Sequence, residues 1–378
     1  MLWGEFGMSL AERALPGTGG EVAGLRASLD RWSARDVLPG VAMAVGVGDR
    51  VVFEHWTGDA CRYGGARRAL GRDTLFDAAS LTKVMVTLPL VLTLHARGVV
   101  HLDSPVRQRL PELGADKAAV TVRHLLTHTS GLPAHREFWR RCGTYAEVLA
   151  AVVAEPLVHE PGERFGYSDL GFILLGEMVR RSTGRSLAEA ADGLFARLGM
   201  DRSGFLPGPE PDVAATEVVD GVALQGSVHD ENAAAMGGVA GHAGLFVTLS
   251  DTARYAAQWS QHAPLLLPHP LAAEAMALHT HDGQGGRRAL AWVAAGDAQW
   301  DHVGTAWPAS SRSHTGFTGT SIAVDPVSRA WTVVLSNAVH AGRPRPRLRE
   351  AREDLHTRAW ALLQRHRDDT VVRTTPGT

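Results

Sequence analysis

The chain of 378 residues has almost no lysine. Of its 38 basic residues, only Lys83 and Lys117 are lysines, and all others are arginines. Arginine stays protonated at any ordinary pH, whereas a desolvated lysine can lose its proton and act as a base. Lys83 follows Ser80 by three residues, which makes the pair a candidate for chemistry. The spacing alone fits equally well a helix N-cap serine with an exposed lysine nearby.

The sequence also lacks disulfide and membrane signals. Cys61 and Cys142 are its only cysteines, too few for a disulfide scaffold, and we interpret both as ordinary thiols. The longest apolar run, residues 84–94, is too short to span a bilayer and predicts a buried helix. No basic segment followed by an apolar one appears in the first thirty residues, so we expect no signal peptide. This favours a cytoplasmic location, or a periplasmic one if the start of the chain is misassigned.

The charge balance excludes some partners. The formal net charge of −2 argues against nucleic acid as the main partner. Arginines are frequent in residues 343–373, but acidic residues are interleaved with them, which is typical of a solvated helix face. None of the 18 histidines belongs to an H-E-x-x-H or cysteine-rich arrangement. We therefore expect no metal and no other cofactor, and a small molecule as the partner.

Apolar patterning predicts an α+β fold built from both chain ends. Residues 41–47 and 51–56 form one expected hairpin, and residues 320–324 and 330–335 form a second. Helical spacing covers residues 22–34 and 346–366 at the two ends, and most of residues 78–289 between them. We expect one antiparallel sheet domain from residues 22–77 and 290–368, flanked by terminal helices. Residues 78–289 would be an inserted helical domain, and residues 1–21 and 369–378 flexible termini.

Ser80 is expected at a helix N-terminus, because helical spacing begins at Leu81. Backbone N–H groups and the helix dipole favour a developing oxyanion at that position. The i,i+3 spacing places Lys83 on the same face as Ser80, within reach of the hydroxyl. A lysine that is neutral or shares its proton could then activate the serine.

Two further segments carry candidate residues. Tyr167, one of four tyrosines, lies in a glycine-rich loop just before a predicted helix, where its side chain could reach a cleft or simply pack a turn. The segment Ser313-His314-Thr315-Gly316-Phe317 opens the second hairpin. A glycine there lets a ligand approach the backbone closely, and the N–H of Phe317 could donate to an oxyanion. A glycine-rich strand entry without function is the alternative.

In chain order, Ser80-x-x-Lys83, Tyr167-x-Asp169 and His314-Thr315-Gly316 resemble the motifs of the serine β-lactamase and penicillin-binding-protein superfamily. The sequence of these motifs is most similar to that of the branch of class C β-lactamases, esterases and D-alanyl-D-alanine carboxypeptidases. The resemblance extends to residues 76–83, 124–132, 161–169, 228–232 and 237–246, and covers about residues 22–366. It implies the β-lactamase/transpeptidase-like fold, the same split sheet with a helical insertion that the patterning predicts.

The resemblance also implies a role for each motif residue. Ser80 would be the acylated nucleophile, with Lys83 and Tyr167 sharing the general-base work. The backbone N–H groups of Ser80 and Phe317 would form the oxyanion hole. The implied substrate-binding residues are Asp169, His314, Thr315 and Gly316.

The chain departs from the family pattern at two positions. Asp169 stands where the family usually has asparagine, and a carboxylate near Lys83 should favour the charged ammonium and weaken it as a base. We therefore expect more of the base role to fall to Tyr167. His314 stands where β-lactamases usually have lysine, and a largely neutral histidine attracts a substrate carboxylate less. Both changes argue against efficient β-lactam hydrolysis.

The predicted function is a serine hydrolase that forms an acyl-enzyme. Its expected substrates are esters first, D-amino-acid peptides second and β-lactams third. The alternative is a penicillin-binding or ligand-sensing module of the same fold with little turnover. We expect the acyl pocket walls near Tyr145 and in residues 204–246 and 279–312.

The histidines of two other segments receive structural interpretations. His124, His128 and Thr129 are expected to hold a helix-to-loop turn. Residues 228–246 are interpreted as a glycine-rich loop bordering the cleft, in preference to a metal site formed by His229, Asp230, Glu231 and His242.

Overall fold

The computed structural model describes residues 19–207, 212–261, 265–280, 283, 285–299, 301–343 and 345–374, with side chains as far as residue 367. An antiparallel sheet of seven strands, in the order β3-β2-β1-β12-β11-β10-β9, unites segments from both parts of the chain. Its strands are β1 (Gly40–Val47), β2 (Arg50–Tyr63), β3 (Ala66–Ala69), β9 (Val293–Ala294), β10 (Arg312–Thr315), β11 (Ser321–Asp325) and β12 (Ala330–Ser336). Both expected hairpins are confirmed.

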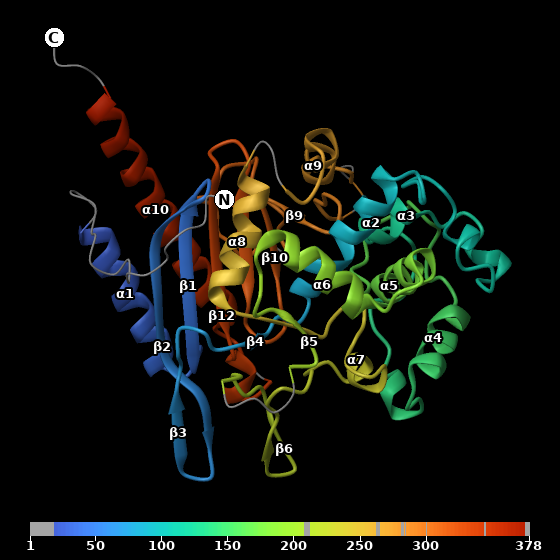
Figure 1. The fold of residues 1–378 in the computed structure, drawn as a ribbon, viewed down its shortest axis with the longest axis horizontal. Helices are drawn as coiled ribbons and strands as arrows, with labels where there is room; N and C mark the ends of the chain where they lie inside the picture. The colour runs from blue at the N-terminus through green and yellow to red at the C-terminus, as the bar shows by residue number, and fades with distance from the viewer. Residues whose placement is uncertain are drawn as a thin grey trace.

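Two terminal helices cover one face of this sheet (Figure 1). They are α1 (Gly19–Ala34) and α10 (Leu348–Thr374). Strand β1 is buried on both faces, with Val41, Met43 and Val45 in the core beneath these helices. Ala42 and Ala44 belong to the larger core on the opposite face, as the two-residue period of a strand requires. The expected α+β class is thereby confirmed.

The opposite face of the sheet carries α8 and the helical part of the molecule (Figure 1). The helices there are α2 (Leu88–Ala96), α3 (Val122–Leu126), α4 (Tyr145–Ala154), α5 (Asp169–Thr183), α6 (Leu187–Leu198), α7 (Glu231–Ala235), α8 (Leu249–Ser260) and α9 (His269–Met276). The short strands are β4 (Phe76–Asp77), β5 (Gly204–Phe205) and β8 (Leu245–Val247), with a separate hairpin of β6 (Val218–Val219) and β7 (Val222–Ala223). Among the described helices, none combines the length and apolar character needed to cross a membrane.

Capping residues set the limits of α5, the helix that follows Tyr167. The Ser168 hydroxyl accepts a hydrogen bond from the Gly171 N–H at the helix start. At the other end Gly184 adopts a left-handed conformation, with φ at 68°, which glycine tolerates at no steric cost. The N-cap of α5 is therefore the residue that directly follows Tyr167, which fixes where the helix begins.

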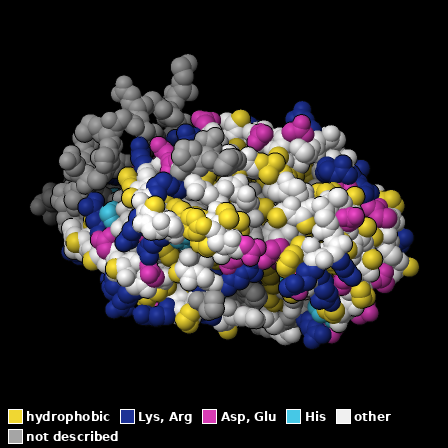
Figure 2. Space-filling view, turned by 90° about the horizontal axis from the view of Figure 1, so that it is seen from below, with side chains coloured by type: hydrophobic (Ala, Val, Ile, Leu, Met, Phe, Trp, Pro, Cys, Tyr) yellow, Lys and Arg dark blue, Asp and Glu magenta, His cyan; other side chains and the backbone are white. Residues whose placement is uncertain are grey.

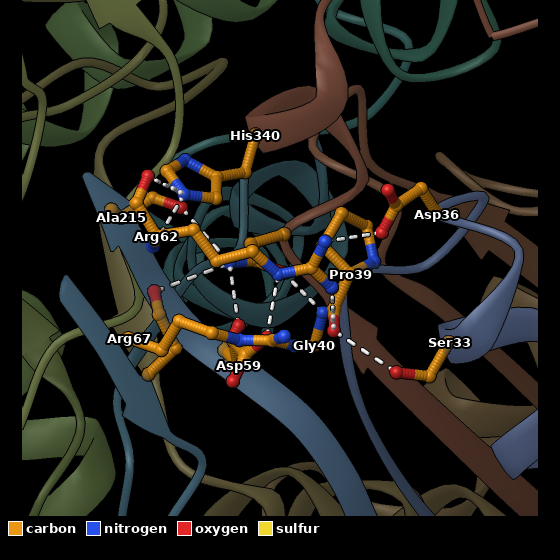
Figure 3. A network of polar contacts seen from close by, with 11 residues as sticks. Ser33, Asp36, Pro39, Gly40, Asp59, Arg62, Arg67, Ala215 and His340 are labelled. Carbon is orange, nitrogen blue, oxygen red and sulfur yellow. Dashed lines mark hydrogen bonds and ion pairs between the residues drawn. The ribbon is translucent and has the colours of Figure 1, made fainter. Parts of the chain in front are cut away.

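A polar network ties β2 to segments from distant parts of the chain (Figure 3). The Asp59 carboxylate accepts hydrogen bonds from the guanidinium groups of Arg62 and Arg67. His340 accepts the Arg62 N–H at 2.8 Å, and its other ring nitrogen lies 2.8 Å from the Thr216 carbonyl oxygen. Through His340, the network connects the loop before β6 to β2.

Two expectations about the chain ends need correction. Residues 19–21 and 369–374 are helical, because α1 begins at Gly19 and α10 continues to Thr374. The rest of the expected flexible termini, residues 1–18 and 375–378, lies outside the described residues.

The interpretation of the C-terminal arginines as a solvated helix face holds only in part. Arg347, Arg349 and Arg358 pair with carboxylates at the helix surface. Arg352 is instead 4% exposed. On the face seen in Figure 2, arginine side chains are interspersed with aspartate and glutamate rather than gathered in one field.

Candidate functional site

A cavity of about 540 Å³ lies where the Ser80 turn meets the turn that follows β10. Seven of the residues singled out in the sequence line it: Ser80, Tyr167, Asp169, His314, Thr315, Gly316 and Phe317. Lys83 lies beneath them with a fully buried side chain. The fold thus brings together residues separated by more than 230 positions in the chain.

The Ser80 turn is strained and firmly held. Ala79 has a φ of 48°, in the left-handed region that residues with a Cβ seldom adopt. Its N–H donates to the buried Asp77 carboxylate at 2.8 Å, and the same carboxylate accepts the His229 N–H at 2.7 Å. After Ser80 the helix opens into a π-helical turn, Lys83–Thr87, a feature common at functional sites. The serine is presented to the cavity by backbone that cannot relax easily.

Lys83 directs its ammonium group at the serine. Its Nζ lies 2.9 Å from the Ser80 Oγ and 3.0 Å from the carbonyl oxygen of His242. The same Nζ lies 5.1 Å from the centre of the Tyr167 ring. The expected proximity of Ser80, Lys83 and Tyr167 is therefore present.

Asp169 forms an ion pair with Lys83, with 2.8 Å between Oδ1 and Nζ. Burial alone would lower the pKa of Lys83, but the Asp169 carboxylate outweighs it and raises that pKa to about 12. Burial likewise opposes ionisation of Asp169, yet Lys83 and His135 hold the pKa of this carboxyl below its usual range. Both groups are charged at neutral pH, as the sequence led us to expect.

Tyr167 packs on His128. Their ring centres are 4.5 Å apart in a stacked arrangement. The His128 Nδ1 accepts the Ser168 N–H at 3.0 Å, which fixes the position of the residue next to Tyr167. Burial raises the pKa of Tyr167, while the Lys83 charge opposes that rise. His128 was expected to hold a helix-to-loop turn, and the structure shows that it also supports the loop of Tyr167. His124 completes a capping box with Thr121.

His314 lies on β10 with 2% of its surface exposed. Burial, together with the charges of Lys83 and Arg288, holds the pKa of His314 well below its usual value. The ring is therefore neutral at pH 7. A cation does reach the cavity from elsewhere, because Arg288 lines it and stacks over Phe165 at 4.2 Å.

The turn after β10 crosses close to the Ser80 turn. The Thr318 hydroxyl donates to the Asp77 carbonyl at 2.8 Å, and the Thr320 hydroxyl donates to the Ala78 carbonyl at 3.1 Å. A Cβ on Gly316 would lie 2.1 Å from the Thr320 Oγ1 and 2.5 Å from the Ala78 oxygen. Only glycine fits this approach.

Two backbone donors in these turns are available to a ligand. Within the described ranges, neither the Ser80 N–H nor the Phe317 N–H has an acceptor in the protein. The Phe317 side chain is exposed and stacks on His229, with ring centres 5.5 Å apart. These are the two N–H groups that the sequence resemblance implies for an oxyanion hole.

The sequence missed several cavity residues. His135, Arg345 and Arg352 line the cavity without belonging to any motif or expected wall, whereas Arg288 lies in residues 279–312, where a wall was expected. Arg352 could have been noticed, because it lies on the same side of its helix as Leu348 and Leu355. Tyr145, expected near the pocket walls, instead donates to the Glu177 carboxylate at 2.8 Å and does not line the cavity.

The segment from residue 228 to 246 does border the cavity, through His229, Asp230 and Glu231. The His242 Nε2 lies 2.9 Å from the Asp230 carboxylate, and the His229 Nε2 lies 3.2 Å from that of Glu217. In the part of the chain that the structure describes, no group of three His, Cys, Asp or Glu side chains is arranged to hold a metal ion. Cys61 and Cys142 are free thiols.

Comparisons with known proteins show the family to which the chain belongs. The protein-family model described as beta-lactamase matches residues 25–357. A protein of Escherichia coli K12 whose name proposes a D-alanyl-D-alanine carboxypeptidase activity is 29% identical, over 83% of this chain and 82% of its own length. Esterase EstB of Burkholderia gladioli is 35% identical, over 53% of this chain and 55% of its own.

The fold is also that of a solved structure. The penicillin-binding protein homologue from Pyrococcus abyssi superposes with a TM-score of 0.72 and 21% identity, over 94% of this chain and 82% of its own. The family model covers most of the chain, and curated relatives and neighbours of the same fold are hydrolases. The chain therefore belongs to the β-lactamase family and is a hydrolase of that family.

Proposed function

We propose that the chain is a serine hydrolase that forms an acyl-enzyme on Ser80, with esters as preferred substrates. The observation that carries this proposal is the 2.9 Å contact between the Ser80 Oγ and the Lys83 Nζ beside an open cavity. A serine so placed, with backbone N–H donors nearby, has the parts needed for acyl transfer.

The charge states suggest how the parts divide the work. Lys83 is an ammonium ion at neutral pH and donates its hydrogen bond to Ser80, so it stabilises negative charge rather than accepting a proton. Because burial raises the pKa of Tyr167, the base is the minor fraction of Tyr167 that is ionised as a phenolate, which takes the hydroxyl proton as the Ser80 oxygen attacks the substrate carbonyl. The phenol then returns that proton to the leaving group, and water repeats the sequence to release the acid. The Ser80 and Phe317 N–H groups receive the carbonyl oxygen as its charge develops.

Two motif positions of the site favour esters over β-lactams. His314 is neutral and Asp169 is anionic, so two positions that usually attract or accommodate an anionic lactam do not do so here. D-amino-acid peptides come second, since a relative bears a carboxypeptidase name. No cofactor is needed for this chemistry.

A pair of assays tests the proposal. The purified chain is incubated with a p-nitrophenyl ester and with a chromogenic cephalosporin, each beside the Ser80→Ala variant. We expect ester turnover that Ser80→Ala abolishes, and little cephalosporin hydrolysis. A fluorophosphonate probe read by mass spectrometry should modify Ser80.

Two outcomes contradict the proposal. Absence of a Ser80 adduct under all conditions rules out the enzyme mechanism. An adduct that forms with ester or penicillin and never clears favours a sensing or penicillin-binding module instead.

A further inference from the structure

Arg352 is a buried cation behind the turn that carries Phe317. Arg352 lies on α10 between the buried residues Leu348 and Leu355, and 4% of its surface is exposed. Its Nη2 donates to the Gly316 carbonyl at 2.6 Å and to the Thr320 carbonyl at 3.0 Å. One guanidinium group therefore donates a hydrogen bond to each end of the turn.

The bond to Gly316 acts on a particular peptide group. The carbonyl of Gly316 and the N–H of Phe317 belong to the same planar, resonance-coupled amide. A cation bound to the amide oxygen draws electron density toward it and makes the N–H of that amide a stronger donor. The amide polarised by Arg352 is thus the one whose N–H has no acceptor within the described protein.

Nothing described near Arg352 cancels its charge. No carboxylate among the described side chains pairs with it, and its Nη1 instead lies 3.2 Å from the Nδ1 of His302. Burial, followed by the charges of Arg352 and Arg349, keeps His302 neutral by lowering its pKa to about 4. A buried arginine with only neutral partners retains its full field on the amide that it contacts.

Arg352 is not the only group that holds the turn in shape. The Thr318 and Thr320 hydroxyls already attach it to the Ser80 turn. The Gly316 carbonyl also accepts the Gly319 N–H at 3.2 Å, and the Thr320 carbonyl accepts the Gly316 N–H at 2.8 Å. Neither carbonyl would lose its last partner if Arg352 were removed.

We propose that Arg352 is a positioning residue of the oxyanion hole, which orients and polarises the Gly316–Phe317 amide through its bond to the Gly316 carbonyl. This inference rests on the proposed function, because it assigns a task to a residue behind the proposed oxyanion donor. Arg345, in contrast, donates to the Phe317 carbonyl, which belongs to the next amide along the chain.

Arg352→Met is the first test, with Arg352→Lys as the charge-conserving variant. Methionine fits an apolar helix face and leaves no buried charge, so the variant should fold. Arg358→Gln is the matched control, because Arg358 lies on the same helix but pairs with Asp354 at the surface. We expect Arg352→Met to lower kcat for a p-nitrophenyl ester about tenfold, with KM nearly unchanged, since a donor is weakened rather than removed.

A spectroscopic readout separates this role from general support of the fold. Acyl-enzyme is trapped with an ester labelled with carbon-13 at its carbonyl, and the carbonyl stretch is measured by isotope-edited infrared difference spectroscopy. We expect the stretch to move to higher wavenumber in Arg352→Met, because a weaker hydrogen bond polarises the carbonyl less. Arg352→Lys should restore most of the wild-type frequency and rate, and Arg358→Gln should leave both unchanged.

The outcomes are distinguishable. If the wild type forms no acyl-enzyme, the proposed function fails and this inference falls with it. If the wild type is acylated but Arg352→Met shows the wild-type kcat and carbonyl frequency, only the role of Arg352 is overturned. A rise in KM without a change in frequency would also overturn it and assign Arg352 to substrate binding.

Discussion

The Nζ of Lys83 lies 2.8 Å from the Oδ1 of Asp169, and the same Nζ lies 2.9 Å from the Ser80 hydroxyl. An asparagine usually occupies the position of Asp169 in the motif that this chain resembles. Beside an asparagine, the lysine would be free to give up its proton. Beside the Asp169 carboxylate, it forms an ion pair and retains the proton. The base chemistry of this enzyme should therefore respond to pH differently from that of a site with asparagine.

Asp169→Asn tests the ion pair. The Asp169 charge raises the pKa of both Lys83 and Tyr167, so its loss lowers both. We expect the rising limb of the kcat/KM profile against pH to move to lower pH by at least about one unit, whichever group is the base.

Asp116→Asn is the control for that shift. Asp116 pairs with the other lysine, Lys117, also at 2.8 Å, but neither residue lines the cavity. Its profile should coincide with that of the wild type. A limb that stays in place in Asp169→Asn would mean that this carboxylate does not govern the base.

Tyr167→Phe tests which group accepts the serine proton. Phenylalanine keeps the ring that stacks on His128 but removes the only atom able to carry the proton. We expect the rate of acylation to fall about a hundredfold or more, measured by stopped-flow release of p-nitrophenol. Near-normal acylation in this variant would return the base role to Lys83.

Gly316→Ala tests the closeness of the two turns. The added methyl group would lie 2.1 Å from the Thr320 Oγ1 and 2.5 Å from the Ala78 carbonyl oxygen, so the turn must shift. We expect kcat to fall about a hundredfold as the Phe317 N–H moves away from its target. Urea unfolding should show a loss of about 1–3 kcal/mol, typical of overpacking. Unchanged kcat would show that the turn tolerates displacement.

His128→Asn tests the support of Tyr167. Asparagine tolerates the left-handed backbone of residue 128, whose φ is 57°, and its side-chain oxygen can accept the Ser168 N–H. The stacked ring is lost, which costs about 1 kcal/mol. We expect kcat to fall about tenfold with little change in KM, while thermal unfolding shifts by only a few degrees. A fall confined to stability would indicate that Tyr167 is held by other contacts.

Several features were predictable because their signals are local. The Val41–Val47 alternation and the turn after it specify a hairpin whatever surrounds them, and Thr144 with Glu147 forms the capping box that starts α4. Ser80 and Lys83 share a helix face by their spacing, so their contact followed from the helix itself. These features depend on residues only a few positions apart.

The C-terminal helix shows where such reasoning ends. Acidic residues interleaved with arginines correctly indicate an exposed face for Arg347, Arg349 and Arg358. The same pattern conceals Arg352, which lies one helical turn from Leu348 on the buried side. Charge composition does not reveal which of several arginines a turn from another part of the chain will cover.

By itself, the sequence determined the main elements, the α+β class and the candidates for the reacting groups, because each rests on short-range spacing or on a motif. Tertiary structure decided how those groups are charged. The pKa of Lys83 depends on how closely Asp169 approaches it. The polarity of the Phe317 N–H depends on Arg352, which lies on α10, 36 positions after Gly316. Electrostatic effects depend on distance and burial, and both arise only when the two ends of the chain close around the helical segment.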